Sequence, residues 1–544
     1  MVRDDGYADE LRSAAREVFG WQELHPEQLE AMTAVMSGRD VRAVLPTGSG
    51  KSAIYQVPAV LLDGVTLVVS PLIALQQDQI AGLDDTDALR AVAIHSGQGV
   101  HQVEDAWAAV CERDADYVFL SPEQLANDDV VARLASTGVS LIVVDEAHCV
   151  SAWGHDFRPD YLRLPDAFAA IAPSAPVVAL TATASTVVRR EIAERLRLRD
   201  PLFVTGSFDR PNLRLEGRQY LRDADKRSAV VAAVAELAVP GLLYTATRRD
   251  AERYAADLTG RGIGAAVYHA GLSAGQRNAV HEGFRGGHRA EAFDVVVATS
   301  AFGMGIDKPN VRFVVHASVP DSLDSYYQQI GRAGRDGGDA LALLFYRAED
   351  LGLATFFTVH RPNEDLLAAV HGALDVDRPK RIKALRAELD VRGRTLTNAV
   401  NLLEQAGAIT GTRTGFRSTG WAVEDAVRGA VEVVEARERI DRSRVEMMRG
   451  YAETRDCRRQ FLLTYFGETL PGPCGNCDRC AERAADADTA PPAIPVDTAV
   501  SHRDWGRGVV IGGDPDRITV LFDDYGYRTL AMALVEERDL LTAR

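Results

Sequence analysis

Two series of short apolar runs, separated by helix-length segments, constrain the fold of this chain more than any other feature. The first series lies at 41–45, 65–69, 117–120, 141–144 and 177–180, and the second at 242–244, 265–268, 295–298, 312–316 and 341–345. Runs without a polar face are typical of parallel strands buried on both sides, and helices connect such strands. The sequence therefore predicts two doubly wound α/β lobes, residues 1–204 and 205–350, with a hinge near 201–212 and ligands at the carboxyl ends of the strands.

A glycine-rich loop, LPTGSGKS at 45–52, follows the first apolar run and leads into a helix-compatible segment. Backbone N–H groups at the start of a helix can cradle phosphates. Lys51 would reach the β and γ phosphates, and Ser52 would ligate Mg²⁺. Leu45 replaces the first glycine of the usual pattern, at the end of a strand. ATP and Mg²⁺ are the expected ligands of the loop residues Thr47, Gly48, Ser49, Gly50, Lys51 and Ser52.

An acidic pair, Asp145 and Glu146, ends the apolar run 141–144. Carboxylates at a strand end can hold Mg²⁺ and aim a water molecule at a phosphate. Aromatic and basic residues suited to stacking on unpaired bases follow directly: Trp153, His155, Phe157 and Arg158. A solvated, acidic helix start is the alternative for the pair alone, and the phosphate loop favours catalysis.

Two arginines, Arg332 and Arg335, lie three residues apart in SYYQQIGRAGRDG at 325–337. On a predicted helix this spacing points both side chains to one side. An arginine from the second lobe could stabilise charge on the γ-phosphate of ATP. A basic helix face is the ordinary alternative.

Four of the six cysteines form the pattern C-x16-C-x2-C-x2-C: Cys457, Cys474, Cys477 and Cys480. This spacing suits a tetrahedral zinc site. Disulfides are a poorer alternative, because the N-terminus lacks a secretion signal pattern.

Together these motifs resemble the RecQ family of superfamily two helicases, from about residue 19 to residue 480. The resemblance implies two RecA-like lobes and a zinc module. Residues 19–28 resemble its adenine-recognition motif, with Gln28 reading the base and Trp21 and His25 flanking it. Residues 68–79 resemble its DNA-backbone grip, and residues 153–158 its sensor of single-stranded DNA. The motifs at 180–185 and 295–316 resemble elements that couple ATP to DNA through Thr181, Thr183, Thr299 and Asp307.

The resemblance implies an ATP-dependent DNA helicase that moves 3′ to 5′ on single-stranded DNA, unwinds tailed or forked duplexes, and serves DNA repair or recombination. The alternative is a DNA-dependent ATPase or translocase that remodels protein–DNA complexes without separating strands.

Residues 360–425 contain two helix-length segments and a hairpin-like stretch, the order of a winged helix. Nine Lys or Arg residues stand against four Asp or Glu residues at 376–420. In most of the family such a module follows the zinc site. Phe416 or Trp421 is a candidate wedge between base pairs, beside Arg413 and Arg417. A helical spacer with a polar hairpin is the alternative.

The C-terminal part of the chain is predicted to contain a helical zinc-binding module at 426–483, a linker at 484–497 and a small β-barrel at 498–544. The last segment resembles the SH3-like or Tudor-like barrel of other helicases, which contacts partner proteins. A barrel that merely packs on the zinc module is the alternative.

The net charge of −17 disfavours a broadly basic nucleic-acid surface, although a motor needs only a narrow groove that grips a few phosphates. No apolar run approaches the roughly 20 residues that span a bilayer. We expect a cytoplasmic, nucleoid-associated protein without a membrane partner.

Overall fold

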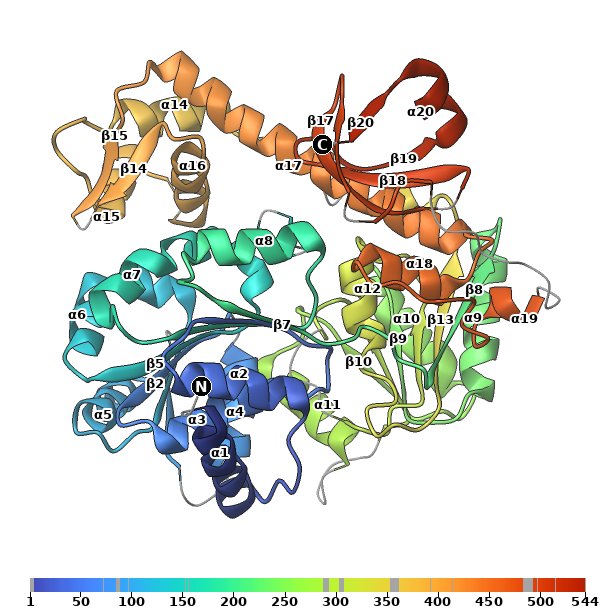
Figure 1. The fold of residues 1–544 in the computed structure, drawn as a ribbon, viewed down its shortest axis with the longest axis horizontal. Helices are drawn as coiled ribbons and strands as arrows, with labels where there is room; N and C mark the ends of the chain where they lie inside the picture. The colour runs from blue at the N-terminus through green and yellow to red at the C-terminus, as the bar shows by residue number, and fades with distance from the viewer. Residues whose placement is uncertain are drawn as a thin grey trace. The chain divides into compact units, whose positions relative to one another are not determined.

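The computed structural model describes residues 4–71, 73–84, 89–95, 97–151, 153–154, 156–286, 293–302, 308–352, 362–391, 393–412, 414–482, 493–496, 498–513 and 515–543. His155, Asp307 and most of the predicted linker at 484–497 lie outside these residues. The chain forms two compact units (Figure 1): Met1–Ala348 with Tyr451–Thr489, and Glu349–Gly450 with Ala490–Arg544. Each unit is described by itself.

The first lobe is built on a seven-stranded parallel sheet of order β3-β4-β2-β5-β6-β1-β7. Its strands are β1 (Val41–Val44), β2 (Val65–Val69), β3 (Ala91–Ile94), β4 (Tyr117–Leu120), β5 (Val139–Val144), β6 (Val177–Thr181) and β7 (Leu202–Thr205). Its α-helices are α1 (Asp4–Phe19), α2 (Pro26–Met36), α3 (Ala53–Leu61), α4 (Ile73–Asp84), α5 (Val100–Cys111), α6 (Asp128–Ala135), α7 (Leu164–Ile171) and α8 (Thr186–Arg195). Figure 1 shows α7 and α8 on one face of the sheet and α2 and α3 on the other.

The second lobe contains a six-stranded parallel sheet of order β10-β11-β9-β12-β13-β8. Its strands are β8 (Leu213–Gln219), β9 (Gly241–Tyr244), β10 (Ala265–Tyr268), β11 (Val295–Ala298), β12 (Phe313–His316) and β13 (Ala340–Tyr346). Its helices are α9 (Asp223–Glu236), α10 (Arg248–Thr259), α11 (Ala274–Arg285) and α12 (Leu323–Ile330). The predicted pair of parallel-sheet lobes is confirmed.

The sequence does not predict the edge strands β3, β7 and β8. β7 and β8 expose alternate or terminal residues, and LRLEGRQ of β8 has no continuous apolar run. An edge strand needs less apolar surface than a central parallel strand. The stretch 201–212, expected to be a hinge, therefore begins with a strand paired to β1.

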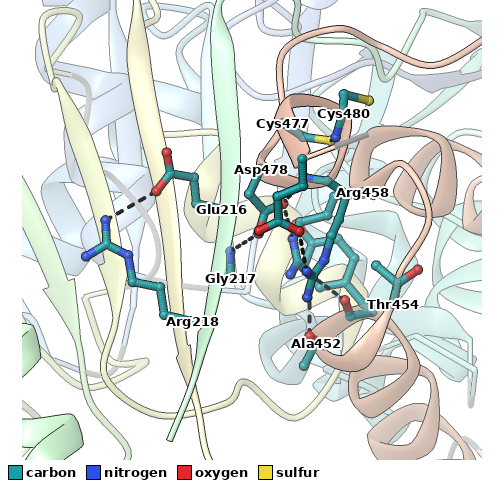
Figure 2. Close-up of polar contacts among 12 residues, drawn as sticks. Glu216, Gly217, Arg218, Ala452, Thr454, Arg458, Cys477, Asp478 and Cys480 are labelled. Atoms are coloured by element: carbon teal, nitrogen blue, oxygen red, sulfur yellow. Dashed lines mark hydrogen bonds and ion pairs between the residues drawn. The ribbon is translucent and has the colours of Figure 1, made fainter. Parts of the chain in front are cut away.

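The cysteine-bearing segment packs on β8 and covers that edge of the second sheet. It contains α18 (Arg458–Tyr465) and α19 (Asp478–Glu482). Figure 2 shows Asp478 between Gly217 N (2.9 Å) and Arg458 Nε (2.7 Å). Arg458 is fully buried, and a Cβ at Gly217 would lie 2.5 Å from its guanidinium. A glycine at this point of the edge strand lets the buried ion pair form.

The second unit contains the predicted helix, turn, helix and ribbon. Its elements are α14 (Glu364–Gly372), α15 (Ile382–Leu389), α16 (Gly393–Gln405), β14 (Ile409–Thr412) and β15 (Gly415–Ser418). Lys380 and Phe416 exchange two backbone hydrogen bonds, which add a short third strand to the hairpin. This order of elements is that of a winged helix. The long helix α17 (Val423–Glu453) follows it.

The C-terminal segment forms a five-stranded antiparallel sheet of order β19-β18-β17-β16-β20. Its elements are β16 (Ala499–His502), β17 (Gly506–Gly513), β18 (Arg517–Phe522), β19 (Gly526–Ala531), α20 (Met532–Arg538) and β20 (Leu541–Ala543). The sheet lies against α17, where Arg439 sits 5.9 Å from the centre of the Tyr525 ring. The antiparallel strands of the predicted small β-barrel are confirmed; within the described residues they form a sheet whose edges are β19 and β20.

Gly241 tests the packing of the second lobe. A Cβ at this position of β9 would overlap the ring of Phe313 on the neighbouring strand β12. We expect Gly241→Ala to lower the free energy of unfolding by about 1–3 kcal/mol through overpacking. In Gly275→Ala, the control on α11, the new methyl meets no atom within 4 Å, and the change should stay below about 1 kcal/mol. Urea unfolding of both variants measures the difference, and equal effects would contradict this view of β9.

Candidate active site

The phosphate loop turns between β1 and α3 by means of two glycines. Gly48 and Gly50 have φ values of +86° and +66°, in the left-handed region that favours glycine. A Cβ at Gly50 would also lie 2.7 Å from the Gln28 amide nitrogen. These glycines form the turn that leads into α3, and Ser49 N donates to Pro46 O (3.2 Å) within it.

Gln28 ties the adenine-recognition segment to this loop. Its buried amide donates to Ser49 O (2.9 Å) and Gly50 O (3.0 Å), and its Oε1 accepts from His25 N (2.9 Å). His25 is exposed, whereas the half-buried Trp21 stacks on Phe19 with the ring centres 4.6 Å apart. Gln28 and His25 thus lie together at the flank of the loop, and the Trp21 ring packs against Phe19.

Lys51 is half-buried at the centre of the site. Its ammonium donates to Leu45 O (3.1 Å) and Pro46 O (3.3 Å). Burial lowers the pKa of Lys51, and the charges of Glu146 and Asp145 oppose that shift. Among the described residues, the buried Thr47 hydroxyl has no hydrogen-bond partner. A cationic side chain and an unsatisfied hydroxyl fit a nucleotide phosphate.

The acidic pair lies at the carboxyl end of β5, next to Lys51. Burial and the charge of Glu146 raise the pKa of Asp145 to about 6, and Lys51 opposes the rise. Asp145 accepts hydrogen bonds from Glu146 N (2.9 Å) and Gln79 Nε2 (3.2 Å). Two close carboxylates with Ser52 on the facing loop form an oxygen donor set that fits Mg²⁺.

A chain of short polar contacts runs from the acidic pair to β6. His148 Nδ1 lies 3.3 Å from Glu146 Oε2 and 2.9 Å from Thr181 Oγ1. Thr181 Oγ1 in turn donates to Thr183 O (3.0 Å). His148 is not among the residues predicted from the sequence, although its place two residues after Glu146 is a usable signal. The chain joins Glu146 to the two threonines predicted to couple ATP and DNA.

The two arginines do not lie on one helix face, contrary to the sequence prediction. α12 ends at Ile330, because Gly331 and the left-handed Gly334 (φ +59°) allow a loop there. Arg335 approaches the phosphate loop, where a Cβ at Gly48 would lie 3.3 Å from its Cγ. Arg332 is buried and donates a hydrogen bond to Tyr244. Burial raises the pKa of Tyr244, and the charge and hydrogen bond of Arg332 oppose that rise. Of the two, Arg335 lies against the phosphate loop, and its charge helps to lower the pKa of Lys51.

The predicted DNA-sensing loop folds back onto the acidic motif. Trp153 and Phe157 are only 9% and 7% exposed. Arg158 donates to Pro71 O (3.0 Å) and pairs with Asp156. A Cβ at Gly154 would overlap His148 O. Base stacking on these rings stays a prediction, and it requires the loop to turn outward.

Two further predicted site residues lie away from this centre. Thr299 is half-buried just after β11, with its N–H donating to Tyr268 O (3.2 Å). Phe416 is 7% exposed and belongs to the hydrophobic core of the winged domain. The wedge role predicted for Phe416 is therefore wrong in this conformation, because its ring fills the core. Trp421 is 43% exposed.

The four cysteines come together as the sequence predicts. The sulfur atoms of Cys457, Cys474, Cys477 and Cys480 lie within 4.8 Å of one another. Backbone N–H groups of Cys474, Asn476 and Cys480 point at sulfurs of the cluster at 3.3–3.4 Å. N–H groups directed at sulfur stabilise thiolates, so this donor set fits a tetrahedral zinc ion. Figure 2 places Cys477 and Cys480 beside Asp478.

Family models match three parts of the chain. DEAD/DEAH box helicase matches residues 25–190, the helicase conserved C-terminal domain residues 230–337, and RecQ zinc-binding residues 422–481. The probable ATP-dependent DNA helicase RecS of Bacillus subtilis is 31% identical over 481 residues, which cover 88% of this chain and 92% of RecS. The chain therefore belongs to the RecQ family of helicases.

Individual relatives cover the chain to different extents. The ATP-dependent DNA helicase RecQ of Haemophilus influenzae is 33% identical over 470 residues, 86% of this chain. The chain spans 63% of that relative and 61% of RecQ of Pasteurella multocida. Two solved structures have a similar fold. The DNA-bound helicase MrfA has a TM-score of 0.53 and 17% identity, and the match covers 77% of this chain and 60% of MrfA. The DEAD-box helicase Mss116 bound to single-stranded RNA has a TM-score of 0.52 and 17% identity, and the match covers 74% of this chain and 91% of Mss116. No helix within the described residues is long and apolar enough to cross a membrane.

Asp145 gives a stability prediction with a defined pH window. Its pKa rises from 3.8 to about 6 on folding. Between these values the folded protein binds a proton that the unfolded chain has released, so the free energy of unfolding falls as the pH rises. Asp145→Asn removes this loss and should stabilise the protein by about 1–3 kcal/mol at about pH 8, and far less at about pH 4. Urea unfolding at both pH values tests this, and an equal gain at both would contradict it.

Cys474 tests the zinc centre. We expect Cys474→Ser to lower the zinc content below one ion per chain. The melting temperature should fall by at least about 5 °C, because zinc binding contributes to folding. Metal analysis and thermal unfolding of the purified protein measure both effects. Cys111→Ser is the control, since Cys111 is exposed and lies on α5. Full zinc content in Cys474→Ser would remove this cysteine from the site.

Proposed function

We propose that this protein is an ATP-dependent DNA helicase that moves 3′ to 5′ on single-stranded DNA. The observation that carries the proposal is the approach of Arg335, from the second lobe, to Gly48 of the phosphate loop. A site completed by both lobes changes when ATP is hydrolysed, so hydrolysis can drive the motion of one lobe against the other. Membership of the RecQ family supports DNA as the substrate.

Each residue of the site has a definite part in hydrolysis. The loop amides and Lys51 bind the phosphates, and Arg335 stabilises the charge that develops on the γ-phosphate. Glu146 orients the attacking water and takes its proton. Asp145 and Ser52 would hold Mg²⁺, which when bound neutralises phosphate charge.

Coupling to DNA would use the chain from Glu146 through His148 to Thr181. Its short distances mean that a shift at the motif 180–185 moves the catalytic carboxylate. Thr183, Thr299 and Asp307 belong to the same proposed coupling, and Trp153, His155, Phe157 and Arg158 to contact with single-stranded DNA. In this scheme DNA draws the buried rings of the loop outward.

The winged domain is the proposed duplex-binding part. Arg381, Lys383 and Arg386 are exposed at the start of and along α15, and charges of this kind bind phosphates. Tailed or forked DNA, a role in repair or recombination, and a cytoplasmic, nucleoid-associated location follow from the family. The C-terminal sheet is the proposed contact for a protein partner.

Translocation without strand separation is the second candidate. The burial of Phe416 favours it, because the described part of the hairpin then offers no exposed aromatic ring to split base pairs, and Trp421, the other candidate wedge, lies beyond the hairpin.

The decisive experiment measures ATP hydrolysis and strand separation on a duplex with a 3′ single-stranded tail and on one with a 5′ tail. Hydrolysis with unwinding of only the 3′-tailed duplex is expected. Hydrolysis without unwinding of either duplex would favour the translocase, and absence of DNA-stimulated hydrolysis would refute both candidates.

Glu146→Gln tests the catalytic assignment in the same assay. We expect the rate of hydrolysis to fall at least about 100-fold with ATP binding retained, because the amide cannot take the proton of water. Glu112→Gln, at the exposed end of α5, is the matched control. A wild-type rate in Glu146→Gln would overturn the role of this residue.

A further inference from the structure

The connection between the lobes, Ser207–Leu213, touches two functional parts of the first unit. It leaves β7, on the edge of the first sheet, and enters β8, on the edge of the second. It contains a turn in which Leu213 N donates to Arg210 O (2.9 Å). The side chains of Arg210 and Asn212 and the backbone carbonyls of Pro211 and Leu213 contact different partners, and that division is the basis of the inference.

One side of the connection holds the loop that carries Arg335. Arg210 donates to the carbonyls of Gly331 (3.4 Å), Ala333 (2.9 Å) and Gly334 (3.0 Å), which lie in the loop that follows α12. Asn212 donates to Gly334 O and Gly338 O, both at 2.8 Å. These five bonds set the path of the backbone on both sides of Arg335.

The zinc module holds the other side. Arg459 donates to Leu213 O (2.7 Å) and Pro211 O (3.4 Å), and its Nε lies 3.5 Å from Asp209 Oδ1. Asn476, between two of the cysteines, donates to Pro211 O (3.0 Å). The module therefore contacts residues 209, 211 and 213, and the arginine loop contacts residues 210 and 212.

Two further contacts fix the start of the connection. Glu468 accepts from Ser207 Oγ (2.5 Å) and Phe208 N (2.7 Å). Phe466 stacks on Phe208 with ring centres 4.6 Å apart and planes within 4°. A connection held at both ends and on alternate residues cannot shift without disturbing the loop of Arg335.

We propose that the zinc module positions Arg335 for hydrolysis through the connection Ser207–Leu213, with Arg459 and Asn476 as positioning residues. Neither residue contacts the nucleotide site. Their loss leaves ATP binding intact and lowers the rate of the chemical step. The inference rests on the proposed function, because it assigns a task within ATP hydrolysis.

Arg459→Ala is the main test, with DNA-stimulated hydrolysis, nucleotide binding and zinc content measured together. We expect kcat to fall about tenfold while KM for ATP changes less than about threefold. Backbone amides at 331–338 should exchange hydrogen faster. Arg455→Ala, at an exposed position of the same module, is the matched control and should match the wild type.

A double variant separates positioning from general damage. In an Arg335→Ala background, Arg459→Ala should lower the residual rate by less than about twofold, because the residue that it positions is gone. A full tenfold fall in that background, or an unchanged kcat in Arg459→Ala alone, would overturn the inference.

Asn476→Ala keeps the test open if Arg459→Ala fails to fold. It preserves the backbone N–H directed at Cys474 Sγ, so the zinc content should remain that of the wild type. We expect a fall in kcat of about threefold, again without a change in KM. An unchanged kcat would refute the inference, whereas a wild-type protein without hydrolysis would refute the proposed function itself.

Discussion

The packing of the half-buried Lys51 beside the buried Asp145 and Glu146 is the interaction on which the structure of the site depends. Removing these charges from water is costly, and mutual attraction and hydrogen bonds must offset that cost. The carbonyls of Leu45 and Pro46 satisfy the ammonium, and Gln79 and a backbone N–H satisfy Asp145. The parallel sheet brings these charges together, because β5, β6 and β1 are neighbours whose carboxyl ends share one edge.

The same edge supports the proposed coupling of hydrolysis to DNA binding. β5 ends in the acidic pair and β6 ends in Thr181, so His148 can bridge them with contacts of 3.3 and 2.9 Å. The loop of Trp153 and Phe157 packs on the same motif. The acidic motif, the end of β6 and the loop of Trp153 and Phe157 are thus in contact with one another. A change in the conformation of one of them can therefore alter the stability of the others.

The zinc module is part of the motor lobes and not an appendage. Its bridge from Cys477 to Leu215 and the ion pair of Asp478 with Arg458 cover the edge of the second sheet. Glycine at position 217 is required for this packing, because a Cβ there would overlap the guanidinium of Arg458. An edge strand covered in this way cannot pair with other chains. The zinc module also contacts the connection Ser207–Leu213, and through these contacts we propose that it positions Arg335.

The sequence by itself determined the central strands, the phosphate loop, the acidic pair and the cysteine cluster, because each is encoded by residues close together in the chain. Apolar runs, glycine spacing and cysteine spacing report local requirements directly. Only the tertiary structure decided the edge strands β7 and β8, the loop position of Arg335, the bridging role of His148, and the burial of Phe416 and Trp153. These features depend on contacts between segments far apart in sequence: whether a ring faces solvent, or a helix ends early, depends on partners such as Arg210 that no local pattern reveals.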